Sequence, residues 1–249
     1  MRSRAWRVAA TGFSFAVFGI GAFLLALFVT LLILPLPISR QKKRLWTRSL
    51  VFSTTQLYIR MMRGLGLLEV VFVDAHRLEN AGQIVVANHP SLLDAVFLFS
   101  RVPNANCVVK SAMARNPFTA AMVSLAGYIP NSESGERMVS LAVDAIAKGE
   151  NLIVFPEGTR TSPDSASVFK RGAAQVALVA NCPIQPVHIS CKPATLRKHE
   201  PWYCVPKTPP LFTFTALPCF RASERIDGSK PGGVQARELT RVLKALLLD

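Results

Sequence analysis

A long run without a single charged side chain lies near the start of this sequence. No Asp, Glu, Lys or Arg occurs from Val8 to Ser39, and Phe13–Leu36 is strongly apolar. About 20 apolar residues are enough for a helix to cross a bilayer. A signal peptide would have a shorter apolar core and a small-residue cleavage site, whereas this run ends in Pro35–Ile38. The segment therefore predicts an uncleaved N-terminal membrane anchor, either a spanning helix or a helical hairpin lying partly in one leaflet.

Basic residues flank this run unevenly. The cluster after it, which outnumbers the three Arg before it, comprises Arg40, Lys42, Lys43, Arg44 and Arg48. Because positive charge is retained on the cytoplasmic side, the pattern predicts an inner-membrane protein with its downstream domain in the cytoplasm. The following segment, Leu45–Leu68, is a second predicted helix. It would lie either at the membrane surface or against the downstream domain.

The composition favours an anionic, lipid-like environment. Half of the 249 residues are hydrophobic, only 18% are charged, and the net charge is +14. Such a basic balance indicates phospholipid headgroups or phosphate-bearing substrates. Nucleic acid is disfavoured, because no aromatic-interleaved basic stripe or DNA-reading motif occurs. The five Cys are odd in number and lack a CxxC pair, which argues against a disulfide framework, and the spacing of Cys and His between 182 and 204 matches no common zinc pattern.

From Glu69 onward, short β-rich runs alternate with helix-like stretches. The predicted strands are Glu69–Val73, Gln83–Ala87, Asn106–Lys110, Asn151–Phe155, Ile184–Ile189 and Leu211–Thr215. The predicted helices are Ser91–Phe99, Pro117–Leu125, Gly135–Lys148, Phe169–Ala180 and Val234–Leu248, with a long loop at Cys191–Pro210. This alternation predicts an α/β fold with a largely parallel central sheet flanked by helices. We expect an anchor and interfacial helix at 1–68 and a catalytic domain at 69–249.

The first candidate site is Asn88-His89-Pro90-Ser91-Leu92-Leu93-Asp94, between a strand and a helix. Pro90 suits the first position of a helix. With His89 in the turn before that helix, its ring can fold back onto Asp94. A carboxylate on one ring nitrogen fixes the tautomer and leaves the other nitrogen to act as a base. The alternative is a capping His and an unrelated surface carboxylate.

The second candidate site is Phe155-Pro156-Glu157-Gly158-Thr159-Arg160-Thr161, at the end of another strand. Ligands of open α/β sheets bind beyond the carboxyl ends of the strands. Gly158 allows close approach of the backbone to a ligand, and Arg160 offers a planar fork for phosphate. The alternative is an ordinary turn with a solvated Arg.

Together the two motifs, NHxxxxD and then FPEGTR about sixty residues later, resemble the 1-acylglycerol-3-phosphate (lysophospholipid) acyltransferase family of glycerolipid acyltransferases. Three further segments are similar to that family over about Glu69–His188: Lys110 with Pro117, Phe169-Lys170-Arg171-Gly172-Ala173, and Pro183-Ile184-Gln185-Pro186-Val187. One block departs. The family usually has an Arg in a GxxFIDR-like stretch, whereas Gly127–Ser132 has none, and Arg137 is the next candidate.

The resemblance implies an enzyme that moves a fatty acyl group from acyl-carrier protein or coenzyme A to a lysophospholipid hydroxyl. His89 would be the base and Asp94 would orient it, with no metal or organic cofactor. Residues implied in substrate binding are Asn88, Lys110, Glu157, Gly158, Thr159, Arg160, Lys170 and Arg171. The default acceptor is 1-acylglycerol-3-phosphate, giving phosphatidic acid. The departing block leaves open another acceptor, such as a lyso-amino-acid lipid, and a non-catalytic membrane-anchored lipid-binding protein is the alternative from another class.

Overall fold

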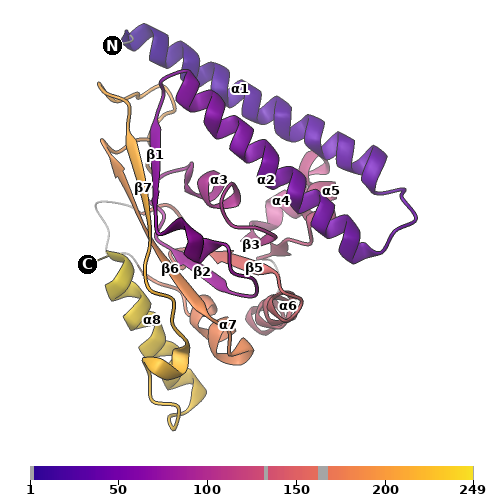
Figure 1. The fold of residues 1–249 in the computed structure, drawn as a ribbon, viewed down its shortest axis with the longest axis vertical. Helices are drawn as coiled ribbons and strands as arrows, with labels where there is room; N and C mark the ends of the chain where they lie inside the picture. The colour runs from indigo at the N-terminus through magenta and orange to yellow at the C-terminus, as the bar shows by residue number, and fades with distance from the viewer. Residues whose placement is uncertain (1–2, 132–133, 162–167, 249) are drawn as a thin grey trace.

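A single mixed sheet forms the centre of the computed structural model, which describes residues 3–131, 134–161 and 168–248 (Figure 1). Within these residues its seven strands run in the order β1-β7-β6-β2-β5-β3-β4. Their bounds are β1 Glu69–Val73, β2 Ile84–Ala87, β3 Ala105–Val109, β4 Ile129–Pro130, β5 Asn151–Val154, β6 Ile184–Lys192 and β7 Leu211–Ala216. The sheet confirms the predicted α/β class.

All neighbouring strands are parallel except β6 and β7. The carboxyl ends of β2, β3, β5 and β6 therefore lie at one edge of the sheet. Because β7 runs the other way and β1 is parallel to it, the amino ends of β7 and β1 lie at this same edge, with Lys192 opposite Leu211. This edge is where the two predicted motifs meet.

The central strand β2 is buried along its whole length, and three of the four residues of its neighbour β5 are buried, which explains their apolar sequences. Ile84 and Val86 of β2 point into one core, whereas Val85 and Ala87 point into the other. The first core lies under α6 (Gly135–Ala147), α7 (Gly172–Ala180) and α8 (Gly232–Leu248). The second lies under α2 (Arg40–Gly64), α3 (Asp94–Phe99) and β1, with α4 (Ser111–Arg115) and α5 (Pro117–Ala126) nearby.

The N-terminal segment forms a helical hairpin. Helix α1 (Arg4–Phe28) continues into a π-helical turn, η1 (Val29–Ile33), and the chain then returns as α2, alongside α1 (Figure 1). The Tyr58 hydroxyl of α2 donates to the Ser14 carbonyl of α1 at 3.3 Å. Helix α2 in turn packs on α3 and α5. The second helix is thus packed against the rest of the protein, as one of the two sequence interpretations proposed.

The outward face of α1 is apolar and exposed. Within the described residues, Arg4–Ile33 is the one helical stretch long and apolar enough to cross a membrane, and little of it is buried. Its exposed large side chains are Trp6, Phe13, Phe18, Ile20, Phe23, Leu24, Leu27, Phe28, Leu31 and Leu32. A helix of this kind in water would present a large apolar surface, which indicates that a lipid phase covers it.

Two of the basic residues that flank the apolar run are buried in the protein. Arg48 Nη2 lies 2.9 Å from Glu150 Oε2, and Arg48 Nε donates to the Ala126 carbonyl at 2.7 Å. Arg7 is only 7% exposed and lies between α1 and the sheet edge. Both were expected to be membrane-flanking cations. Both side chains are instead buried, because they are long enough to extend from their helices into the interior of the protein.

Two helices begin later than the sequence predicted. Helix α3 begins at Asp94 rather than Ser91, and α7 begins at Gly172 rather than Phe169. The pattern also missed β4 and α4, which span two and five residues. Elements this short carry too few residues to display a period.

Candidate active site

His89 and Asp94 form a hydrogen-bonded pair at the carboxyl end of β2. His89 Nδ1 lies 2.9 Å from Asp94 Oδ2, and the Asp94 side chain is fully buried while that of His89 is 17% exposed. Within the described residues, His89 Nε2 has no hydrogen-bond partner. The carboxylate therefore favours the tautomer with the proton on Nδ1, which leaves the Nε2 lone pair available to accept a proton.

The turn between the two residues is not helical, and hydrogen bonds to the Asp94 side chain and to the Leu196 loop stabilise it. Asp94 Oδ2 also accepts the Ser91 N–H at 2.7 Å, and the Leu92 N–H donates to the Leu196 carbonyl at 3.2 Å. These bonds use the N–H groups in a non-helical arrangement, so Pro90 is not the first residue of a helix as the sequence suggested. The pairing of His89 with Asp94 arises from this compact turn.

The surroundings of the pair are apolar. The His89 ring stacks on Phe155, with centroids 4.2 Å apart and an interplanar angle of 24°. Burial raises the pKa of the Asp94 carboxyl above its ordinary value, while the hydrogen bond with His89 and the Ser91 N–H act against that rise. A buried carboxylate with few competing partners is a strong orienting group for one imidazole nitrogen.

Asn88 holds two strands together behind the site. Its Nδ2 donates to the Ile189 carbonyl at 2.8 Å, and its Oδ1 accepts the Ile189 N–H at 2.7 Å. The side chain thus makes the two hydrogen bonds that a strand backbone would make to Ile189, just beyond the end of β2. It is 6% exposed, so the structure places it as a support for the His89 turn.

Glu157 connects the two motifs. Its Oε1 accepts the backbone N–H of His89 at 2.9 Å and the Thr161 hydroxyl at 2.9 Å. The Thr161 N–H donates to the His89 carbonyl at 2.7 Å. Glu157 is only 8% exposed, and its carboxylate is bonded to the backbone of the turn that carries His89. The two motifs are therefore one structural unit.

Gly158, Thr159 and Lys170 form the exposed side of the same turn. Gly158 has φ +68°, and a β-carbon there would come within 2.9 Å of Lys170 Nζ, so the absence of a side chain lets the ammonium lie over the backbone. The Lys170 N–H donates to the Pro156 carbonyl at 2.8 Å. This places one cation beside the FPEGTR turn, near His89.

Arg160 is bonded to a neighbouring loop. Its Nη1 donates to the carbonyls of Leu196 and Arg197, at 2.9 and 2.8 Å. The side chain is partly exposed. Arg160 thus connects the FPEGTR turn to the loop that follows β6.

The other predicted binding residues lie further along the edge. Lys110 follows β3 and is exposed, and Arg171 is exposed just before α7. In the departing block, Asn131 Oδ1 accepts the Ser111 N–H at 2.9 Å, and Ser132 lies outside the described residues. Arg137 is exposed on α6.

The backbone N–H groups nearest the two motifs already have hydrogen-bond acceptors. The Gly158 N–H donates to the Phe155 carbonyl at 3.0 Å, and the Ser91 and Leu92 N–H groups donate to Asp94 and Leu196. Stabilising a negative oxygen here would require a side-chain donor or a shift of these groups.

Sequence reasoning gave no role to three contributors: Phe155, Thr161 and the Thr195–Leu196 loop. Phe155 opens the FPEGTR motif and Thr161 follows it directly, so their position was a usable signal. The loop is far away in sequence, and only the fold brings the Thr195 carbonyl within 3.0 Å of Ser91 Oγ. Within the described residues no group of three His, Cys, Asp or Glu side chains could hold a metal ion, and the five Cys are free thiols.

A His–Asp pair at the carboxyl edge of a largely parallel sheet, joined to a Pro-Glu-Gly-Thr-Arg turn, defines the class of this domain. Residues 69–190 match the family model described as Acyltransferase. Residues 69–190 therefore form a domain of that family.

Several curated proteins are similar in sequence to this chain. It is 33% identical over 151 residues to the 1-acyl-sn-glycerol-3-phosphate acyltransferase of Saccharomyces cerevisiae, covering 55% of this chain and 48% of that protein. It is 30% identical over 141 residues to the enzyme of that name from Limnanthes alba, covering 52% and 50%. The chain thus spans about half the length of these curated relatives. The crystal structure of the 1-acyl-sn-glycerophosphate (LPA) acyltransferase PlsC from Thermotoga maritima has the same fold, with TM-score 0.71, 20% identity and 98% of each chain covered.

Proposed function

We propose that this protein transfers a fatty acyl group from a thioester to the hydroxyl of a lysophospholipid, with His89 as general base. One observation carries the proposal: His89 Nδ1 is held by the buried Asp94 carboxylate, while Nε2 has no hydrogen-bond partner among the described residues and the side chain is partly exposed. The names of the similar curated proteins support the same reaction class.

In the proposed step, His89 Nε2 accepts the proton of the acceptor hydroxyl as its oxygen attacks the thioester carbonyl. The carbon–sulfur bond then breaks, and the proton on His89 passes to the departing thiolate. Asp94 stays ionised throughout and stabilises the imidazolium that forms between these events. The reaction balances with two substrates and needs no metal or organic cofactor.

The structure gives little support to an acyl-enzyme route. Ser91 Oγ donates to the Thr195 carbonyl at 3.0 Å, so its hydrogen bond goes away from His89. Burial raises the pKa of the Cys191 thiol to about 11, which leaves almost no thiolate at neutral pH. Direct attack by the acceptor oxygen therefore explains the site better.

The donor would be acyl-carrier protein or a coenzyme A thioester, both acidic, and the acceptor would be 1-acylglycerol-3-phosphate by default. The cations that could meet them at this edge are Lys110, Lys170 and Arg171, with Arg160 holding the turn. Such charges also raise the local concentration of anionic partners. Because the departing block supplies no Arg, a lyso-amino-acid lipid is the alternative acceptor, and a lipid-binding protein without catalysis is the alternative of another class.

The proposed location is the cytoplasmic membrane, with the catalytic domain in the cytoplasm. The exposed apolar face of α1 supports membrane association. The proposed orientation follows from the basic cluster after the apolar run, of which Arg40 and Lys42 remain exposed.

The experiment is an acceptor panel with purified protein in lipid nanodiscs. Acyl-carrier-protein and coenzyme A thioesters of oleate are each offered with lysophosphatidic acid, lysophosphatidylethanolamine or a lyso-ornithine lipid. We expect diacyl product from at least one acceptor, with lysophosphatidic acid the fastest. If no pair of donor and acceptor showed thioester consumption or diacyl product, the proposed activity would be refuted.

A further inference from the structure

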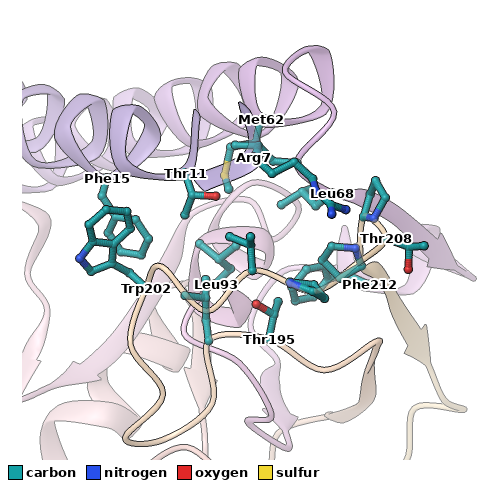
Figure 2. A pocket seen from close by; sticks show the side chains of 16 residues that line it. Arg7, Thr11, Phe15, Met62, Leu68, Leu93, Thr195, Trp202, Thr208 and Phe212 are labelled. Atoms are coloured by element: carbon teal, nitrogen blue, oxygen red, sulfur yellow. The ribbon is translucent and has the colours of Figure 1, made fainter. Parts of the chain in front are cut away.

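A small cavity lies beside the catalytic turn, between α1 and the sheet edge where β1 and β7 begin (Figure 2). Its volume is about 30 Å³. Leu93 and Thr195, which belong to the catalytic turn and its neighbouring loop, form one wall, and Leu68 and Phe212 form another. The cavity thus adjoins the His89–Asp94 pair without containing it.

Arg7 brings an isolated positive charge into this cavity. Its side chain extends from α1 past Met62 toward Leu68 (Figure 2). The residue is 7% exposed, and within the described residues its Nε is buried without a hydrogen-bond partner. A guanidinium cannot lose its proton in a protein. Burying it without a counter-charge is costly, so an anion is expected to complete the site.

No acidic side chain of the described protein supplies that counter-charge. The residues that line the cavity include no Asp or Glu. Residues 1–68 contain none either, and Glu69, the first in the sequence, is engaged with Arg63 at 3.2 Å. Three threonines also line the cavity: Thr11 lies one helical turn from Arg7 along α1, and Thr195 and Thr208 belong to the chain between β6 and β7.

The position of Arg7 along α1 matches the depth of lipid headgroups. Val8 begins the uncharged run, and the exposed face of the helix beyond it is apolar. Charged residues at the ends of membrane helices lie at the level of the headgroups. A volume of about 30 Å³ admits only a few oxygen atoms, so the acyl chain of the ligand would stay outside, along α1.

We propose that Arg7 and the threonines around it bind the headgroup of an acidic membrane lipid, through a phosphate monoester or carboxylate, at a site separate from the catalytic pair. The planar fork of Arg pairs with two oxygens of such a group. Lipid bound there would fasten α1 to the sheet edge next to the His89 turn. A free phosphate ion shares this chemistry, and the apolar surroundings of the cavity favour the lipid.

The test measures thermal unfolding of the purified full-length protein in detergent, titrated with dioleoyl phosphatidic acid, dioleoyl phosphatidylcholine or inorganic phosphate. Phosphatidic acid should raise Tm for the wild type and for Arg4→Gln, which changes an exposed Arg on the same helix. Arg7→Gln should weaken the apparent affinity roughly tenfold or more. Thr11→Val, a milder change, should weaken it less and serves if Arg7→Gln does not fold.

Three results would overturn the proposal. They are an equal phosphatidic acid response in Arg7→Gln, an equal response of the wild type to phosphatidylcholine, and an equal response to inorganic phosphate, which would indicate a free-anion site. His89→Ala should keep the full response. The lipid site can therefore fail while the proposed transfer activity stands, and the reverse.

Discussion

The carboxylate of Glu157 accepts a hydrogen bond from the backbone N–H of His89, at 2.9 Å. The two residues lie in the turns that follow β2 and β5, which are neighbouring strands in the sheet. The bond fixes the backbone from which the His89 side chain extends. A residue of the FPEGTR motif thus positions the proposed base of the NHxxxxD motif.

This contact predicts a graded effect of substitution at Glu157. Glu157→Ala removes the acceptor of both the His89 N–H and the Thr161 hydroxyl, so the turn loses its alignment. We expect kcat to fall by about 10²-fold, the scale of a misplaced catalytic group. Glu157→Gln keeps one oxygen and should lose much less. Steady-state transfer assays on both variants check this, and equal kcat for Glu157→Ala and the wild type would rule out a positioning role.

Asp94 should show a trade-off between stability and activity. Its pKa is raised above the unfolded value by burial. Between those two pKa values the folded state binds more protons than the unfolded state, so the unfolding free energy decreases as pH rises through that interval. Asp94→Asn removes this dependence while lowering kcat by about 10³–10⁴-fold through loss of the tautomer.

The measurement is Tm against pH for both proteins. The Tm of Asp94→Asn relative to the wild type should increase as pH rises from acid toward neutrality. The reverse trend would show that the ionised carboxylate is net stabilising in the fold.

The Arg48–Glu150 pair predicts a stability effect far from the site. Arg48 also donates to the Ala126 carbonyl, and both side chains of the pair are buried. Arg48→Met removes the buried charge partner of Glu150 and leaves the more distant Arg44, at 4.0 Å. Breaking a buried pair in this way costs about 3–5 kcal/mol. Arg60→Met, at an exposed position on the same helix, should stay within about 0.5 kcal/mol. Denaturant unfolding in detergent distinguishes them, and equal midpoints would contradict the buried pairing.

The outward face of α1 predicts how the protein meets the membrane. Leu24 and Leu31 are 54% and 60% exposed. Changing both to Glu places two charges where the hydrocarbon should be, at a cost of about 3 kcal/mol each. We expect the double variant to be lost from floating vesicles in a density gradient. Val168→Glu, at an exposed site outside this helix, should float like the wild type, and flotation of both variants would place the membrane contact elsewhere.

Most strands of the fold could be predicted from the sequence, because regular strands leave a recognisable apolar pattern. Strand Glu69–Val73 was predicted with its observed bounds, and the runs around Ile84 and Leu152 were apolar enough to mark central strands. The strand order was not readable, because the pairing of β7 with both β1 and β6 depends on contacts between distant segments. The same holds for Arg48, whose partner Glu150 lies 102 positions away.

Part of the candidate site could also be predicted from the sequence. His89 and Asp94 were predicted to pair, and the structure brings them to 2.9 Å. Asn88, Glu157 and Arg160 were expected to bind substrate, and the structure shows each of them bonded within the protein. A motif marks which residues matter at a site, but whether a side chain faces ligand or backbone is decided by the turn around it.

The most direct measurement is acyl transfer by His89→Ala in nanodiscs, with oleoyl thioester donors and the preferred lysophospholipid acceptor. Losing the base should reduce kcat by about 10²–10⁴-fold, with vesicle flotation and Tm close to those of the wild type. Turnover within about twofold of the wild type, in a variant verified by mass, would show that His89 is not the base of the reaction.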